Sequence, residues 1–350
     1  MMSHPVKLII DTDPGIDDAL AIFLALGHRS QSEVQVLALT TTYGNSPDVR
    51  QMSNNAQKIL NLAKQPLIPI YEGAASPLIV DTNIETYVEQ ALQAQSVFIH
   101  GRDGLGDISP PLPGEWTPKD LSAAEAIVQL VRQYPHEIEV VTLGPLTNLA
   151  LAIMICPSIV SRIKRVVMMG GALSSPRGHP TNTPDANCGN VTACAEANIY
   201  KDPHAAHRVF NAGFPAADLI MVPIDLTTQT CYASSNIHDV LTSTASAIGD
   251  FIQRSHALYI DSYLGLGRSS VPFHDSCAVF FALCPTEFTT ELVSVDVETK
   301  GTLTFGMTVI DGRLSRKTSN VTVCRSVNAP ALYDALKHAI CRLNEIVMHG

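Results

Sequence analysis

The sequence predicts an α/β fold in which helices flank a mainly parallel central sheet. Short apolar runs alternate with helical patterns over more than half of the 350 residues, as in chains of βαβ units. The apolar runs are continuous, as expected for strands that are buried on both faces. Hydrophobic residues make up 46% of the chain, enough for a large core, and no change of composition marks a linker. We therefore expect a single domain over residues 1–350, with its motif-bearing core at about 6–310.

The first predicted elements follow one another closely. Residues 6–11 (VKLIID) and 34–42 (VQVLALTTT) predict two strands. Between them, residues 17–27 (DDALAIFLALG) predict a helix that a glycine closes. Residues 46–64 have a helical pattern, and residues 67–71 (LIPIY) predict a third strand.

The same alternation continues through the middle of the chain. A helix is expected at about 119–133, a strand at 137–143 (EIEVVTL) and a second helix at 145–155 (PLTNLALAIMI). Residues 165–169 (RVVMM) predict a further strand, and a C-terminal helix is expected at about 329–347.

Polar or glycine-rich segments stand where four of these strands end. Asp11 and Asp13 end the first strand, and residues 41–45 (TTYGN) end the second. Residues 143–145 and 169–171 end two later strands. In open α/β sheets, ligands bind beyond the carboxyl ends of the strands. We therefore expect these four segments to meet at one rim of the sheet, where the aspartates line a pocket mouth.

Four aspartates lie within eight positions: Asp11, Asp13, Asp17 and Asp18. Crowded carboxylates repel one another and are costly to hold away from water unless they share protons or bind a cation. Ca²⁺ and Mg²⁺ both prefer oxygen ligands. One alternative is that Asp17 and Asp18 only cap the helix that they open, where its dipole favours negative charge. All four together predict a metal or catalytic cluster.

The DTD sequence at residues 11–13 also matches the start of the haloacid-dehalogenase-like phosphatases. In that reading, Asp11 is a nucleophile and Mg²⁺ is the cofactor. The match is short, and a proline follows it where that family usually has other residues. A Mg²⁺-dependent phosphatase is therefore an alternative at this point.

Two later segments favour a sugar-like substrate. Asn190, Glu196 and Asn198 combine amides and a carboxylate, which suit hydroxyl groups better than phosphate. His274 and Asp275 stand together at the start of an apolar helix. Such a pair is often only structural, but the aspartate cluster favours a functional role.

Taken in order, these segments resemble the signatures of the nucleoside hydrolases of the inosine-uridine-preferring type. The matching segments are DTDPGIDDA (11–19), TTYGN (41–45), HGRDGLGD (100–107), LGPLTNLA (143–150), MMGG (168–171), GNVTACAEANIYKDPHAA (189–206) and FHDSCAV (273–279). The resemblance implies one α/β domain around a mainly parallel sheet, with Ca²⁺ bound at the floor of the pocket. It also implies hydrolysis of the N-glycosidic bond of ribonucleosides to free base and ribose.

The resemblance assigns roles around the metal. Asp13 matches the general base that also touches the ion, and Asp18 matches a bidentate ligand. Asp275 matches a third carboxylate ligand, and the backbone carbonyl of Leu143 fills a further position. Asp11 would orient the loop from behind these ligands.

It also assigns the residues that would hold the substrate. Asp17 matches the contact to the ribose 2′-hydroxyl, and His274 is the candidate donor of a proton to the leaving base, with His100 as a second residue near the base. Tyr259 and Tyr263 share one helix face and would either stack on the base or pack in the core. The remaining residues expected around the sugar are Asn45, Met169, Asn190, Glu196 and Asn198.

The base is not fixed by these motifs. Residues 172–188 form a polar, proline-rich connection that is longer than in the family. It would either shape the base pocket or bulge into solvent, and we expect the bulge. The single tryptophan, Trp116, lies outside the matched segments, which disfavours a purine sandwiched between tryptophans. Inosine, guanosine and uridine all stay open as substrates. A non-catalytic nucleoside-binding protein is the third alternative, beside the hydrolase and the phosphatase.

Composition limits the partners. The net charge of −10, without a basic stripe, disfavours nucleic acid. No run is long enough to span a bilayer, and the N-terminus lacks the pattern of a signal peptide. The eight cysteines form no C-x-x-C pair, which predicts reduced thiols and a cytoplasmic location. The resemblance implies a homodimer or homotetramer.

Overall fold

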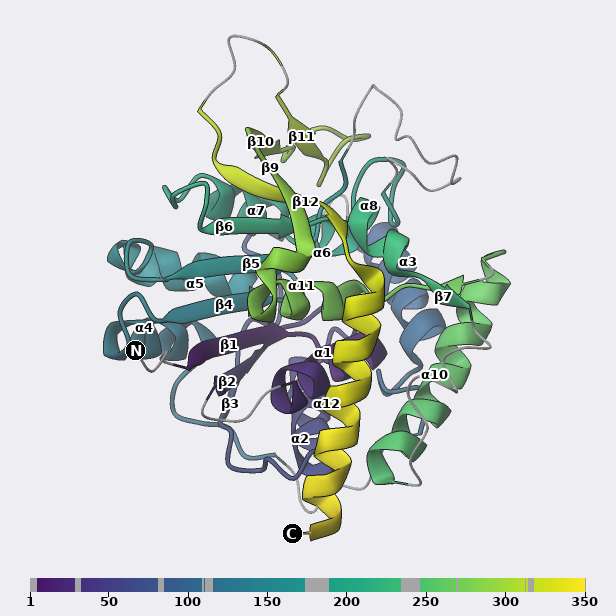
Figure 1. Ribbon diagram of the computed structural model, residues 1–350. Helices are drawn as coiled ribbons and strands as arrows, with labels where there is room; N and C mark the ends of the chain where they lie inside the picture. The colour runs from purple at the N-terminus through teal and green to yellow at the C-terminus, as the bar shows by residue number, and fades with distance from the viewer. Residues whose placement is uncertain are drawn as a thin grey trace.

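An eight-stranded sheet forms the centre of the protein (Figure 1). The computed structural model describes residues 5–28, 33–80, 85–108, 110, 116–173, 189–233, 246–268, 270–311, 313 and 318–349. Most of the connection at 172–188 therefore lies outside the described residues, and its expected bulge stays a prediction.

The strands run β3-β2-β1-β4-β5-β6-β12-β9 across the sheet. All neighbouring pairs are parallel except β12 and β9, which confirms the predicted mainly parallel sheet. The strands of this sheet are β1 (Val6–Thr12), β2 (Val34–Thr41), β3 (Ile70–Glu72), β4 (Ile138–Thr142), β5 (Arg165–Met169), β6 (Leu219–Val222), β9 (Phe288–Val293) and β12 (Val321–Val327). Two short ribbons stand apart, β7 (Tyr232–Ala233) with β8 (Ser270–Val271) and β10 (Val295–Val297) with β11 (Thr308–Ile310).

Helices cover both faces of the sheet, as predicted. Leu8 and Ile10 of β1 face a core shared with α1, α11 and α12, and the intervening Ile9 faces a core shared with α4, α5 and α7. In Figure 1, α12 crosses in front of the other elements. The α-helices are α1 (Ile16–Gly27), α2 (Val49–Leu62), α3 (Glu85–His100), α4 (Ala123–Gln133), α5 (Thr147–Ile155), α6 (Ala197–Lys201), α7 (Pro203–Phe210), α8 (Ile224–Thr227), α10 (Ala247–Gly265), α11 (His274–Leu283) and α12 (Ala329–His349). Short 3₁₀ turns cover Pro157–Ile159, Thr228–Thr230 and Pro285–Glu287.

Several predicted boundaries were too wide, and two examples have a clear local cause. The helix expected at 46–64 begins only at Val49, because the Asp48 side chain caps it by accepting the Arg50 N–H at 2.9 Å. The strand expected at 67–71 begins at Ile70. The residues before it, which include Pro66 and Pro69, form a turn that leads into β3 at the edge of the sheet.

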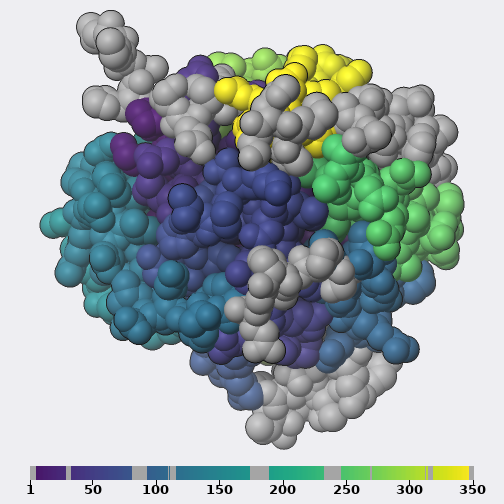
Figure 2. Space-filling view, turned by 90° about the horizontal axis from the view of Figure 1, so that it is seen from below, coloured from purple at the N-terminus to yellow at the C-terminus, as the bar shows by residue number. Residues whose placement is uncertain are grey.

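Segments that are far apart in the sequence lie side by side on the molecular surface. Seen from below, the dark blue residues around α2 fill the middle of one face, between teal residues of the α4 and α5 region and green residues of α10 (Figure 2). Among the described residues, no helix combines the length and the apolar composition that crossing a bilayer requires.

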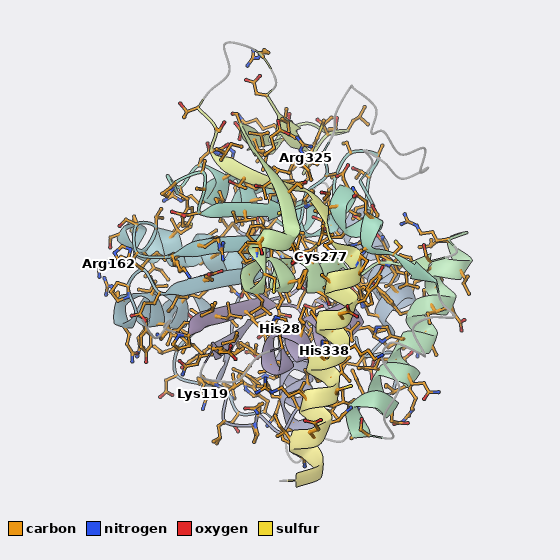
Figure 3. The ribbon with its side chains drawn as sticks, in the orientation of Figure 1. His28, Lys119, Arg162, Cys277, Arg325 and His338 are labelled. Atoms are coloured by element: carbon orange, nitrogen blue, oxygen red, sulfur yellow. The ribbon has the colours of Figure 1, made fainter. Side chains whose placement is uncertain are left out.

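Among the described residues, no disulfide joins one cysteine to another. Cys277 lies in the interior beside α12, whereas Arg162 lies at the edge of the molecule (Figure 3). Burial raises the pKa of Cys277 to about 12, so this thiol stays protonated.

Candidate active site

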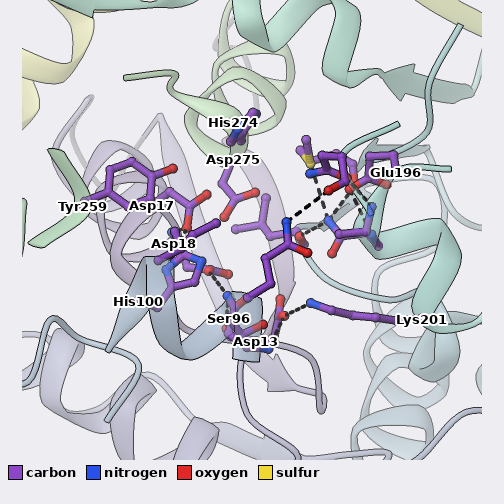
Figure 4. Close-up of a pocket in the computed structure, with 18 of the residues that line it drawn as sticks. Asp13, Asp17, Asp18, Ser96, His100, Glu196, Lys201, Tyr259, His274 and Asp275 are labelled. Atoms are coloured by element: carbon purple, nitrogen blue, oxygen red, sulfur yellow. Dashed lines mark hydrogen bonds and ion pairs between the residues drawn. The ribbon is translucent and has the colours of Figure 1, made fainter. Parts of the chain in front are cut away.

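One pocket opens where β1 lies between β2 and β4, at the carboxyl ends of the strands. This is the point where the strand order reverses, which is the usual ligand site of open α/β sheets. The pocket is lined by every residue predicted for catalysis, metal or substrate: Asp13, Asp17, Asp18, Asn45, His100, Leu143, Met169, Asn190, Glu196, Asn198, Tyr259, Tyr263, His274 and Asp275. Their side chains converge from several separate elements (Figure 4).

The carboxylates of Asp17, Asp18 and Asp275 form the tightest acidic group in the pocket. One oxygen from each lies within 4.8 Å of the other two. Burial, followed by mutual repulsion, raises the pKa of Asp275 well above its ordinary value, and burial raises the pKa of Asp17 to about 6. Three oxygens at this spacing, whose charged forms are disfavoured by burial, fit a hard divalent cation.

Helix α1 explains why Asp18 points into this group. Gly15 precedes the helix, and its backbone N–H donates to Asp18 Oδ2 at 2.8 Å, which closes the first turn. The hydroxyl of Thr12, at the end of β1, donates to the other oxygen of Asp18. The strand–turn–helix connection therefore fixes the carboxylate from two sides.

Asp13 stands slightly apart from this group. Its Oδ2 accepts the backbone N–H of Asn45 at 2.8 Å and lies 3.5 Å from Nζ of Lys201. Burial raises the pKa of Asp13, and the charge of Lys201 opposes that rise. The sequence placed Asp13 among the metal ligands and Asp17 on the sugar, whereas the tight group contains Asp17 and not Asp13.

The residues expected around the sugar are held by the backbone. Glu196 caps the start of α6 and accepts the N–H groups of Asn198 at 2.9 Å and Gly171 at 2.8 Å. The amide of Asn198 donates to the carbonyl of Leu143 at 2.7 Å and to the carbonyl of Met169 at 3.2 Å. These contacts join the ends of β4 and β5 to α6, so the polar groups are already oriented.

Two buried histidines lie at the other end of the pocket. His274 has Nδ1 2.6 Å from the Thr227 hydroxyl and Nε2 3.1 Å from the Tyr263 hydroxyl. His100 accepts the backbone N–H of Ile16 through Nδ1 at 3.3 Å. Burial lowers the pKa of His274 to about 3 and that of His100 to about 4. Both rings are therefore neutral near pH 7.

Tyr259 and Tyr263 pack together on α10, with ring centroids 4.9 Å apart. Their hydroxyls are 3.5 Å apart, and both side chains are buried while they line the pocket. They therefore contribute both to the core and to the pocket wall, so the two roles considered for them are compatible.

Asp11 lies beneath the pocket and is fully buried. Its Oδ1 accepts the hydroxyl of Thr40 at 2.6 Å and the amide of Asn148 at 2.8 Å. A nucleophile must reach its substrate, so this position argues against the phosphatase alternative. Asp11 instead links β1 to β2 and α5 behind the acidic group.

The pocket also contains residues that the sequence analysis missed: Gln95, Ser96, Ile99, Ala197 and Lys201. Lys201 follows Asn198 by three residues, a spacing that places both side chains on one side of a helical turn. From this spacing, the sequence could have indicated that Lys201 lies near the pocket. Nothing in the sequence marked Gln95 or Ser96, because α3 reaches the pocket only through the tertiary fold.

His256 lies behind the pocket wall, and its titration makes the stability of the protein depend on pH. Its ring packs against Tyr259 with centroids 5.8 Å apart, and burial lowers its pKa to about 4. In the unfolded chain the imidazole of His256 is protonated below about pH 6.5. The folded state binds fewer protons than the unfolded state below that pH, so the protein loses stability as the pH falls. From about pH 7 to about pH 5, we expect the wild type to lose about 2 kcal/mol more unfolding free energy than His256→Gln. Urea titrations in chelator measure this difference, and parallel pH profiles would contradict it.

Comparison with known proteins agrees with this geometry. The family model described as inosine-uridine preferring nucleoside hydrolase matches residues 8–334. The inosine-uridine preferring nucleoside hydrolase of Leishmania major is 36% identical over 319 residues, which cover 89% of this chain and 90% of the relative.

Solved structures agree as well. A plant nucleoside hydrolase superposes with a TM-score of 0.82 at 31% identity, covering 96% of this chain and 99% of its own. A purine-preferring ribonucleoside hydrolase from Gardnerella vaginalis gives 0.80 at 32% identity, covering 97% and 99%. With the pocket in place at the predicted rim, these matches lead to one conclusion: the chain belongs to the family of inosine-uridine preferring nucleoside hydrolases.

Proposed function

We propose that the protein is a Ca²⁺-dependent ribonucleoside hydrolase that releases a free base and ribose from purine or pyrimidine ribosides. One observation carries the proposal: a single pocket combines a tight carboxylate group with the polar set of Asn190, Glu196 and Asn198. The first suits a cation and a positively charged transition state, and the second suits sugar hydroxyls.

The cation would be held by Asp13, Asp18, Asp275 and the carbonyl of Leu143. Nucleoside hydrolases are metal-dependent in general, and the oxygen donors of the pocket suit calcium. A carbonyl has two lone pairs, so Leu143 can accept from Asn198 and still face an ion. When bound, calcium lowers the pKa of a water molecule that it holds, which supplies a nucleophile near neutral pH.

Asp13 is our candidate for the general base. As the oxygen of water bonds to C1′ of the ribose, Asp13 accepts the proton that this water loses. The bond between C1′ and the base nitrogen breaks, and its electron pair leaves with the base. Positive charge grows on the sugar, as in glycoside cleavage, and the surrounding carboxylates stabilise it. We assign Asp17 to the 2′-hydroxyl of the ribose.

The leaving base needs a proton or a hydrogen bond, and His274 is our candidate to provide it. Because Nδ1 and Nε2 of His274 contact Thr227 and Tyr263 and its ring is neutral, we assign it a hydrogen bond that reaches the base by way of the Tyr263 hydroxyl rather than the transfer of a proton. His100 lies on the same side and is our second candidate for a contact to the base.

The proposal includes substrates with several different bases. One relative is called inosine-uridine preferring and another purine-preferring, so inosine, guanosine and uridine are all candidate substrates. Trp116 packs under Arg50, with its ring centroid 5.0 Å from the guanidinium, and does not line the pocket. A cytoplasmic location and a homodimer or homotetramer stay predictions.

Gly144 gives a test of the Asp13 position. A Cβ at residue 144 would lie 2.4 Å from Asp13 Oδ1, so alanine must displace that carboxylate. We expect Gly144→Ala to lower kcat about 100-fold, since small misplacements of a catalytic group have effects of this size. Gly265→Ala is the control, because its Cβ would meet only Phe98 at 3.4 Å. Equal rates for the two variants would contradict the assigned position.

The proposed function is tested by incubating the protein with inosine, guanosine, adenosine, uridine and cytidine, with and without chelator. We expect ribose and free base in equal amounts from at least one 6-oxopurine or pyrimidine riboside, at a rate more than about 100-fold lower in chelator. Tight nucleoside binding without release of base would indicate a binding protein instead. Phosphate release from nucleotides would favour the phosphatase.

A further inference from the structure

Lys201 is the only lysine or arginine among the described residues that line the pocket. It ends α6, and its side chain is 8% exposed. Figure 4 shows its chain extending across the pocket edge to Asp13, where Nζ lies 3.5 Å from Oδ2. A lysine this buried, aimed at the candidate base, differs from an ordinary surface ion pair.

The contacts of Asp13 are uneven between its two oxygens. Oδ2 meets both the N–H of Asn45 at 2.8 Å and the ammonium of Lys201. Among the described residues, no hydrogen bond reaches Oδ1, which lies beside Gly144. Two donors thus hold one oxygen in place and leave the other for the pocket.

We propose that Lys201 is a positioning residue for Asp13: its ammonium holds Oδ2 so that Oδ1 faces the attacking water. The inference rests on the proposed function, in which Asp13 is the base. Asn45 supplies a fixed backbone donor on the same oxygen, so the two groups together restrict rotation of the carboxylate. Lys201 therefore acts through Asp13, and it needs no contact with substrate.

The same charge has a second consequence. Five carboxylates line the pocket (Asp13, Asp17, Asp18, Glu196 and Asp275) and Lys201 offsets one of these negative charges. Burial raises the pKa of Asp17 and of Glu196, and the charge of Lys201 opposes that rise at both carboxylates. A positive charge beside Asp13 would repel a divalent cation held by that carboxylate. We infer that Lys201 orients the base and also makes calcium binding weaker than it would be without this charge.

The test compares Lys201→Met and Lys201→Arg with the wild type. Methionine keeps the buried stem without the charge, and arginine keeps a donor that can reach Oδ2. Lys164→Met is the matched control, because Lys164 pairs with Glu139 at 3.0 Å, is half exposed, and precedes β5 at the amino end of that strand, away from the pocket. Calcium affinity is measured by calorimetry without substrate, and kcat and KM are measured at saturating calcium.

For Lys201→Met we expect calcium to bind about tenfold more tightly, since a repelling charge is lost. We expect kcat to fall about tenfold with KM within about twofold, because orientation of the base affects only the chemical step. Lys201→Arg should recover most of kcat, and Lys164→Met should match the wild type. If Lys201→Met does not fold, Lys201→Gln replaces it with the same expectations.

The outcomes separate this inference from the proposed function. A wild type that binds calcium and cleaves nucleosides, beside a Lys201→Met variant with unchanged kcat and calcium affinity, overturns the role of Lys201 alone. Loss of stability in Lys201→Met with no change in those two quantities means a structural ion pair, and also overturns it. A wild type that neither binds calcium nor releases base overturns both.

Discussion

Replacing Asp13 by asparagine is expected to lower kcat about 10³-fold while the protein stays folded, since general bases contribute rate factors of this order. Asparagine keeps the size of the side chain and can still accept the Asn45 N–H that Asp13 accepts at 2.8 Å. It cannot take a proton from water. The expected result is therefore a loss of kcat with a smaller change in KM. Ribose release from inosine and uridine measures it.

The control for this variant is Asp250→Asn. Asp250 is an exposed residue of α10, paired with Arg254 at 3.2 Å, and it takes the same chemical change outside the pocket. Its rate should equal that of the wild type. Near-normal turnover by Asp13→Asn would remove Asp13 from the mechanism.

Removing divalent cations is the second change with a large expected effect. Dialysis against chelator should lower activity more than about 100-fold, and added calcium should restore it, because bound metal supplies the activated nucleophile in this class of chemistry. Calcium should also raise the midpoint of thermal unfolding in a concentration-dependent way, since it binds only the folded state. In Asp18→Asn, which neutralises one carboxylate of the tight group, added calcium should restore less activity and raise the unfolding midpoint less than in the wild type.

Magnesium is the informative comparison for this experiment. It demands a stricter octahedral geometry than calcium and gives up water reluctantly. We therefore expect it to restore less activity than calcium does. Full activity after exhaustive chelation would contradict the metal-dependent mechanism.

Much of the fold could be predicted because its strands are buried on both faces. Continuous apolar runs such as β1 and β5 have few alternatives, and the helices between them follow from their spacing. The order of the strands could not be predicted, because pairing depends on contacts far apart in the sequence. The antiparallel edge of β9 and β12 and the position of α3 belong to this part of the fold.

The members of the site could be predicted, but their arrangement could not. Strand ends bring Asp13, Asn45, Leu143 and Met169 together by a rule that needs no coordinates. Which aspartates approach one another depends on side-chain rotamers and on neighbours such as Lys201. For that reason Asp17, rather than Asp13, joins the tight group. The spacing from Asn198 could place Lys201 near the pocket, but only the fold shows that its ammonium meets Asp13.

The central claim is that the crowded acids at the rim of the sheet exist to hold a divalent ion beside the ribose. The most direct test is a crystal structure grown in millimolar calcium. We predict an ion at about 2.3–2.6 Å from oxygens of Asp13, Asp18, Asp275 and the Leu143 carbonyl. Carboxylates that point apart with no ion between them would contradict the account.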